Sequence, residues 1–65
     1  MNEYRFIITV QHVGLSPSEY VKERTFEKYI YAKTEHGAWI RVVSEIQSDL
    51  MRFESIYQIN LIEVI

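Results

Sequence analysis

The stretch YRFIITVQHV, residues 4–13, decides the fold. In it Phe6, Ile8 and Val10 alternate with their neighbours, so that they fall on one side of an extended chain. A period of two, rich in β-branched and aromatic residues, predicts a β-strand with one buried face. This strand is therefore expected to lie in a sheet with one side against the core.

A loop and a second strand follow. Gly14 ends the first strand, and Pro17 predicts a loop because it cannot donate a backbone hydrogen bond. The second strand is expected from about Val21 to Lys33, with Tyr29 and Tyr31 on the face opposite its apolar residues. The connection is longer than a tight hairpin needs, and such loops are often functional.

A helix and a third strand complete the chain. Thr34 is a suitable N-cap, because its hydroxyl can accept a hydrogen bond from a free backbone N–H of the first turn. The helix is expected to run to about Leu50, and the last strand from about Ser55 to Val64. The residues that share the apolar helix face are Trp39, Val42, Val43, Ile46 and Leu50.

The element order ββαβ predicts an α+β fold. The chain has 65 residues, which allows a single domain, 1–65, with one pair of layers. A strand–helix–strand connection crosses right-handed, and the simplest arrangement then places the third strand beside the first. We expect a three-stranded antiparallel sheet of order 2-1-3, with the helix packed on one face.

The composition excludes several kinds of site. The chain has no cysteine, so disulfides and thiolate metal sites are impossible. His12 and His36 lack acidic neighbours at metal-ligand spacing and partners for acid–base chemistry, while Gly14 and Gly37 stand alone rather than in a phosphate-binding loop. We therefore expect no cofactor, no metal and no enzymatic activity. A domain this short gains only roughly 3–5 kcal/mol from its core, which makes a binding partner the expected further stabiliser.

Charge and hydropathy point to the compartment and the partner. The formal net charge is −2, with seven Lys and Arg scattered among nine Asp and Glu. Nucleic-acid binding is the less favoured interpretation, because it needs clustered cations, although tyrosines on an open sheet can stack bases. Apolar runs are short and no signal-peptide pattern opens the chain, so a cytoplasmic protein without membrane contact is expected.

The sheet face opposite the helix is the main candidate for binding, because one helix can bury only one side of three strands. Tyr29 and Tyr31 are central, since tyrosine is enriched at binding hot spots, although β propensity would also explain them. A one-residue slip in the third strand would change its contribution. The predicted partner-binding residues are Ile7, Thr9, Val13, Tyr29, Tyr31, Ile56, Ile62 and Val64.

The outer strands and the 14–23 loop are further candidates for contact. The third strand carries only Glu63 between residues 56 and 65, so its free edge could pair with another chain or with a second copy. The second strand is better protected by charge, through Lys22, Glu23, Arg24, Glu27 and Lys28.

Residues 26–34, FEKYIYAKT, run from a strand through Ala32 and Thr34 into the helix. This arrangement, over about half the chain, resembles small phage-encoded proteins that inhibit host machinery, such as the short phage inhibitor of bacterial RNA polymerase and several anti-CRISPR proteins. The resemblance implies a compact, cysteine-free viral protein in the host cytoplasm. Such a protein would bind a host protein, for example a CRISPR effector or RNA polymerase, and block it sterically. A homodimeric structural or regulatory module is the alternative, and a nucleic-acid-binding protein is the third.

Overall fold

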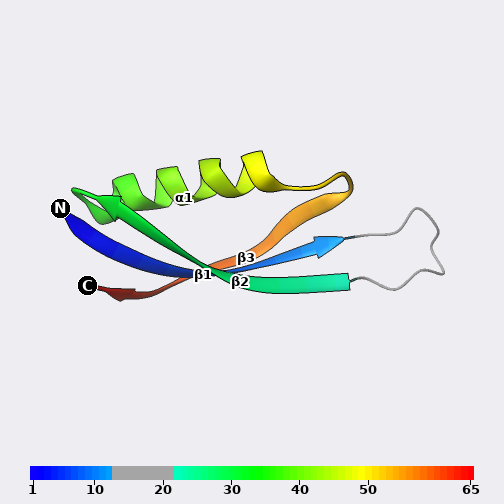
Figure 1. The fold of residues 1–65 in the computed structure, drawn as a ribbon, viewed down its shortest axis with the longest axis horizontal. Helices are drawn as coiled ribbons and strands as arrows, with labels where there is room; N and C mark the ends of the chain where they lie inside the picture. Colours follow the sequence, from blue (N-terminus) through cyan, green and yellow to red (C-terminus); the bar gives the residue numbers. More distant parts are fainter. Residues whose placement is uncertain (13–21) are drawn as a thin grey trace.

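The computed structural model of the protein describes residues 1–12 and 22–65 (Figure 1). Three strands form one antiparallel sheet of order β2-β1-β3, which confirms the predicted α+β fold. Val13 and most of the predicted 14–23 loop lie outside the described residues, and the end of that segment already belongs to β2. The elements in chain order are β1 (Asn2–His12), β2 (Lys22–Ala32), α1 (Glu35–Asp49) and β3 (Glu54–Val64).

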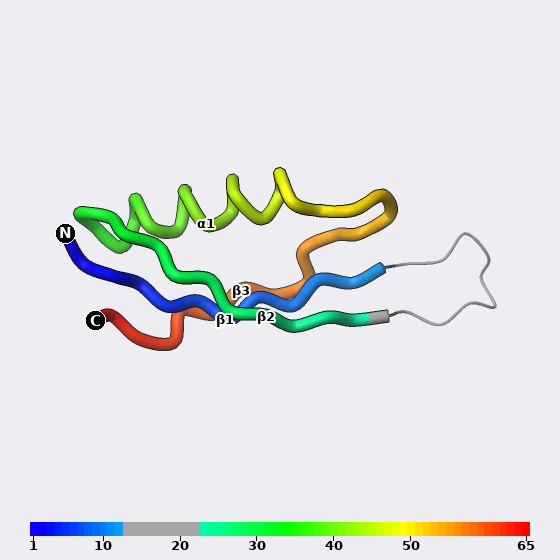
Figure 2. Tube along the Cα trace, in the orientation of Figure 1, coloured from blue at the N-terminus to red at the C-terminus, as the bar shows by residue number. Residues whose placement is uncertain are grey.

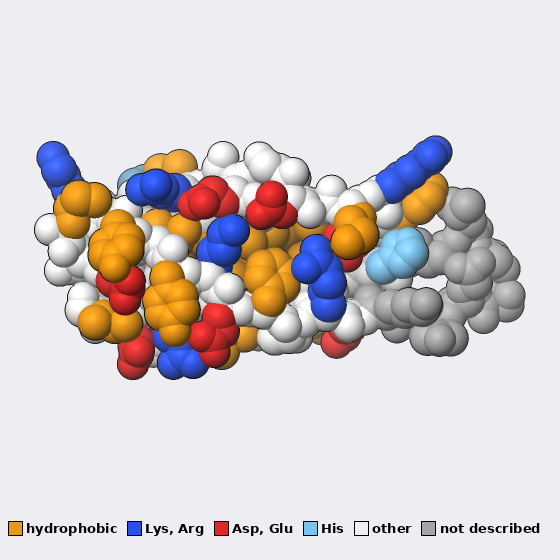
Figure 3. Space-filling view, viewed as in Figure 1, with side chains coloured by type: hydrophobic (Ala, Val, Ile, Leu, Met, Phe, Trp, Pro, Cys, Tyr) orange, Lys and Arg blue, Asp and Glu red, His pale blue; other side chains and the backbone are white. Residues whose placement is uncertain are grey.

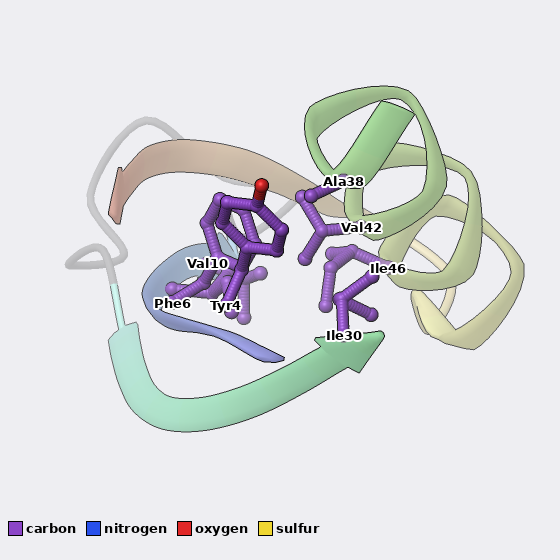
Figure 4. Close-up of a cluster of buried hydrophobic side chains, with 8 residues drawn as sticks. Tyr4, Phe6, Val10, Ile30, Ala38, Val42 and Ile46 are labelled. Atoms are coloured by element: carbon purple, nitrogen blue, oxygen red, sulfur yellow. The ribbon is translucent and has the colours of Figure 1, made fainter. Parts of the chain in front are cut away.

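β1 is the centre of the sheet and supplies half of the core. Tyr4, Phe6, Ile8 and Val10 are all buried, as their alternation predicts. They point toward α1, where they meet helix residues and Ile30 of β2 (Figure 4). The eight buried hydrophobic residues are Tyr4, Phe6, Ile8, Val10, Ile30, Ala38, Val42 and Ile46.

α1 begins at the predicted cap. The backbone N–H of Gly37 donates to Thr34 Oγ1 at 3.0 Å, and the N–H of Ala38 donates to the Thr34 carbonyl oxygen at 3.0 Å. The first bond satisfies one of the N–H groups that a helix leaves free in its first turn, and the second is the first regular hydrogen bond of the helix. Trp39 packs edge-on against Phe6, with ring centroids 5.0 Å apart and an interplanar angle of 77°. Within residues 1–12 and 22–65, no helix is long and apolar enough to cross a membrane.

The helix is shorter than the sheet that it covers. Its 15 residues extend for about 22 Å at 1.5 Å per residue, whereas the 11-residue strands extend for about 36 Å. Its contacts with the sheet are mainly with β2 and then β1, and it runs along one side of the strands (Figure 2). The core-facing residues of β3, which are Ile56, Ile59 and Leu61, are consequently only partly buried.

Two irregularities in β3 overturn part of the predicted face assignment. The register with β1 shifts once between Ile56 and Gln58 and once between Leu61 and Glu63, so each shift adds one residue to β3. Each β-bulge interrupts the alternation of side chains by one position. The prediction that Ile56 lies on the open face is therefore wrong, because Ile56 lies opposite buried Val10 and packs against the core.

Val64 needs the same correction. It lies opposite Tyr4, on the side of the sheet that faces the helix, although its side chain is 51% exposed. Between the two bulges the side chains of β3 alternate between the two faces as a strand predicts. Gln58 and Asn60 lie opposite Thr9 and Ile7, away from the helix.

The two isoleucines of α1 offer a direct test of where the core lies. Ile46 is fully buried, whereas Ile40 is 60% exposed. We expect Ile46→Ala to destabilise the protein by about 2–5 kcal/mol, which approaches the whole stability of so small a domain. Ile40→Ala, the same chemical change in the same helix, should change stability by less than about 0.5 kcal/mol. Urea denaturation followed by circular dichroism measures both, and equal losses would contradict the helix orientation.

Candidate functional site

The sheet face turned away from α1 is a ladder of cross-strand pairs. We call it the open face; on β1 and β2 it consists of Glu3, Arg5, Ile7, Thr9 and Gln11 with their partners Tyr31, Tyr29, Glu27, Thr25 and Glu23. On β3 it includes Ser55, Gln58, Asn60 and Glu63, which lie opposite the same β1 residues. The structure thus confirms the open-face position of four predicted site residues, namely Ile7, Thr9, Tyr29 and Tyr31.

The two tyrosines present their rings to solvent, and each ring lies beside a carboxylate. Tyr29 is 50% exposed and Tyr31 is 57% exposed. The Tyr29 hydroxyl donates to Glu27 Oε2 at 3.2 Å, and this bond to a carboxylate raises the pKa of Tyr29. The carboxylate of Glu3, which lies opposite Tyr31 in the strand pair, likewise raises the pKa of Tyr31. The hydrogen bond to Glu27 therefore orients the Tyr29 ring before any partner arrives, and the Tyr31 ring lies beside a second carboxylate.

Arg5 connects all three strands on this face. Its Nε and Nη2 atoms donate to the two carboxylate oxygens of Glu27 at 3.2 and 2.7 Å, and its Nη1 lies 3.9 Å from Glu63 Oε1. The two-point hydrogen bond with Glu27 raises the pKa of Arg5 and lowers the pKa of Glu27. The guanidinium thus supports the carboxylate that in turn orients Tyr29.

The far half of the open face is polar and internally bonded. The Thr9 and Thr25 hydroxyls lie 3.1 Å apart, and Gln11 Nε2 donates to Glu23 Oε1 at 2.9 Å. The apolar and aromatic character of the open face is therefore concentrated around the tyrosines, near the chain termini. Toward that end of the molecule, hydrophobic side chains lie among acidic ones (Figure 3).

The remaining predicted site residues are scattered. Ile62 is 46% exposed and is the extra residue of a bulge, Ile56 and Val64 are on the helix side, and Val13 lies outside the described residues. Whether any of these residues binds a partner stays a prediction. The prediction missed Arg5 and Glu27 as organisers of the open face, because their pairing follows from the strand register rather than from spacing in the sequence.

A second feature is a hollow of about 300 Å³ at the opposite end of the sheet, lined by His12, Glu23, Arg24, Met51 and Glu54. Arg24 donates through Nε and Nη2 to the Glu54 carboxylate at 2.9 and 3.1 Å, and the backbone N–H of Met51 donates to Glu54 Oε1 at 2.8 Å. The Arg24 bonds are the first cause, and the Met51 bond the second, of a Glu54 pKa of about 2. The charges of Arg24 and Glu54 therefore satisfy each other. The bonds to the Glu54 carboxylate hold the turn between α1 and β3 in place.

That turn contains a conformation unusual for its residue type. Phe53 has a φ of 69°, in the left-handed region that residues other than glycine rarely adopt. Its ring stacks on His12 with centroids 6.4 Å apart, and the Arg52 guanidinium lies 5.0 Å above it. The backbone N–H of Glu54 donates to the Met51 carbonyl oxygen at 3.0 Å and closes the turn. These contacts explain how the turn persists in spite of its backbone strain.

Among the described residues, no three His, Asp or Glu side chains come together as a metal site requires. No family model, no curated protein and no solved structure matches this chain. The open face, with its two exposed tyrosines, is therefore the candidate functional site on geometric grounds.

The hydrogen bonds that Arg24 and the Met51 N–H donate to Glu54, together called the Glu54 clamp, make the stability of the protein fall over a defined range of acid pH. The pKa of Glu54 falls from 4.5 to about 2 on folding, so its stabilising effect is complete above pH 4.5 and is lost as the pH falls toward 2. We expect the melting temperature to drop over this range, and Glu54→Gln to flatten that drop. Glu63→Gln on the same strand, which removes a looser 3.9 Å pair, is the control and should keep most of it. Thermal melts by circular dichroism at several pH values would contradict the clamp if both variants behaved alike.

Proposed function

We propose that this protein is a non-enzymatic protein-binding module whose open face docks onto another protein. The observation that carries the proposal is the pair of half-exposed tyrosines, Tyr29 and Tyr31, each beside a carboxylate on a sheet face that the helix does not cover. Tyrosine supplies a large contact area through few rotatable bonds, which lowers the entropic cost of association. The hydrogen bond that holds the Tyr29 hydroxyl in advance lowers that cost further.

The action that suits such a surface is steric occupation. The open face presents apolar and aromatic contacts beside polar pairs such as Arg5 and Glu27, so it can cover a partner's surface without reacting with it. In line with the resemblance of residues 26–34 to phage-encoded inhibitors, the proposed target is a host protein such as a CRISPR effector or RNA polymerase. The carboxylates around Tyr29 and Tyr31 favour a protein target over a nucleic acid, whose phosphates they would repel.

Photo-cross-linking from two positions tests this function. A photoreactive amino acid at position 29 reports on the open face, and one at position 40 reports on the outer side of α1, where Ile40 is 60% exposed. In an extract of cells that produce the protein, we expect position 29 to give a discrete cross-linked protein that position 40 does not give. The double variant Tyr29→Ala, Tyr31→Ala should then lose binding to that protein, purified, with an unchanged melting temperature. Equal cross-linking from both positions would overturn the proposal.

A second candidate function, a homodimer, is favoured by β3. β3 is an outer strand, and Ile56, Ile59 and Leu61 along it are only partly buried because α1 packs mainly on β2 and β1. Antiparallel pairing of β3 with its own copy would extend the sheet and place these residues near their counterparts. This arrangement leaves the open face free, so the two candidate functions are compatible.

Edge charges test the dimer. Gln58 and Asn60 are exposed residues of β3 on the open face. Changing both to Lys would place like charges across a β3–β3 pair and protect the edge, as natural edge strands do. If the protein sediments as a dimer at low micromolar concentration, we expect Gln58→Lys, Asn60→Lys to give a monomer with the same circular dichroism spectrum. A protein that sediments as a monomer before any substitution would exclude this candidate.

A further inference from the structure

The charges of the sheet are divided between its two faces. Along β2, Glu23 and Glu27 lie on the open face, whereas Arg24 and Lys28 lie opposite Val10 and Phe6 on the helix side. Glu3 and Glu63 add two more carboxylates to the open face. Among the described strand positions of that face, these four carboxylates and the single guanidinium of Arg5 give a formal charge of −4 + 1 = −3.

Arg5, the basic residue among the described strand positions of the open face, already pairs with carboxylates of the same face. Arg5 shares both oxygens of Glu27 and lies 3.9 Å from Glu63, so its guanidinium has little capacity left for a partner. The helix side, by contrast, carries Arg24 and Lys28, which pair there with Glu54 and Asp49. The modest net charge of the whole chain, −2, therefore hides an acidic sheet face.

Tyrosine rings and carboxylates together recognise one kind of chemistry. An aromatic ring attracts a guanidinium or ammonium group to its face, and Tyr29 and Tyr31 are 50% and 57% exposed. The Tyr29 hydroxyl donates to Glu27, and Tyr31 lies opposite Glu3 in the strand pair, so each exposed ring stands beside a carboxylate. An arginine side chain can stack on such a ring and hydrogen-bond the neighbouring carboxylate at the same time.

We propose that the protein surface that docks on the open face is basic, with arginine or lysine side chains placed over Tyr29 and Tyr31. This inference rests on the proposed function and specifies the chemistry of its partner. Complementary charge would speed association and make the affinity fall as salt rises, since exposed charges are screened over about 10 Å at 0.1 M ionic strength.

A peptide titration tests the chemistry without knowledge of the target. The probe is a short peptide of alternating Arg and Gly, and its counterpart carries Glu in place of Arg. With the isotope-labelled protein at low salt, we expect the arginine peptide to shift the NMR signals of Tyr29, Tyr31 and their open-face neighbours, and the glutamate peptide to leave them unchanged. Raising the salt to about 0.15 M should weaken the effect.

Matched charge variants assign the effect to one face. We expect Glu3→Gln, Glu63→Gln to weaken binding of the arginine peptide about three- to tenfold. Glu35→Gln, Asp49→Asn removes the same charge from α1 and should change binding by less than about twofold. Shifts that cluster on α1, equal binding of both peptides, or equal losses in both double variants would overturn the inference.

The two proposals fail in different ways. If position 29 cross-links selectively to a protein whose affinity is unaffected by salt and by Glu3→Gln, Glu63→Gln, the basic partner is wrong and the protein-binding function stands. If position 29 cross-links no more selectively than position 40, the function itself is wrong, whatever the peptide does.

Discussion

A single short helix cannot shield a three-stranded sheet, and the rest of the structure depends on this shortage of cover. The helix is about 22 Å long and about 10 Å across, while the sheet is about 36 Å long and about 14 Å wide. The covered strip contains the whole buried core, which comes from alternate residues of β1 between Tyr4 and Val10, from Ile30 of β2, and from α1 between Ala38 and Ile46. Everything outside that strip has to be compatible with water or with a partner.

The protein handles the uncovered surface in two ways. On the open face, three pairs of polar side chains are hydrogen-bonded across β1 and β2: Arg5 with Glu27, Thr9 with Thr25 and Gln11 with Glu23. Polar groups that satisfy each other in this way need neither burial nor a partner. Tyr29 and Tyr31 differ, because their rings remain exposed although the Tyr29 hydroxyl is bonded to Glu27. The open face is thus ordered in its polar part and available in its aromatic part, which is the division of roles expected at a docking surface.

The sequence predicts those features that depend on local patterns. The period of two in residues 4–13 is strict enough to identify the buried face of β1. Thr34, a hydroxyl residue directly before an amphipathic segment, caps the helix as predicted. The bulges in β3 could not be predicted, because they are defined by the register against β1 rather than by the residues of β3 themselves. For this reason the prediction placed Ile56 and Val64 on the wrong face of the sheet. The acidic character of the open face was hidden for the same reason, since Glu3 and Glu63 come from opposite ends of the chain and share one face only in the folded sheet.

The exposure of the tyrosine rings in the isolated protein is the most direct test of the central claim, that α1 covers only one side of the sheet. Fluorine NMR of protein labelled with fluorotyrosine, with a soluble paramagnetic agent added at low protein concentration, measures this exposure for each ring. We expect strong broadening of the Tyr29 and Tyr31 signals and little broadening of Tyr4, which is 3% exposed beneath the helix. Protection of Tyr29 and Tyr31 to the same degree as Tyr4 would mean that the open face is covered, and would contradict this account of the protein.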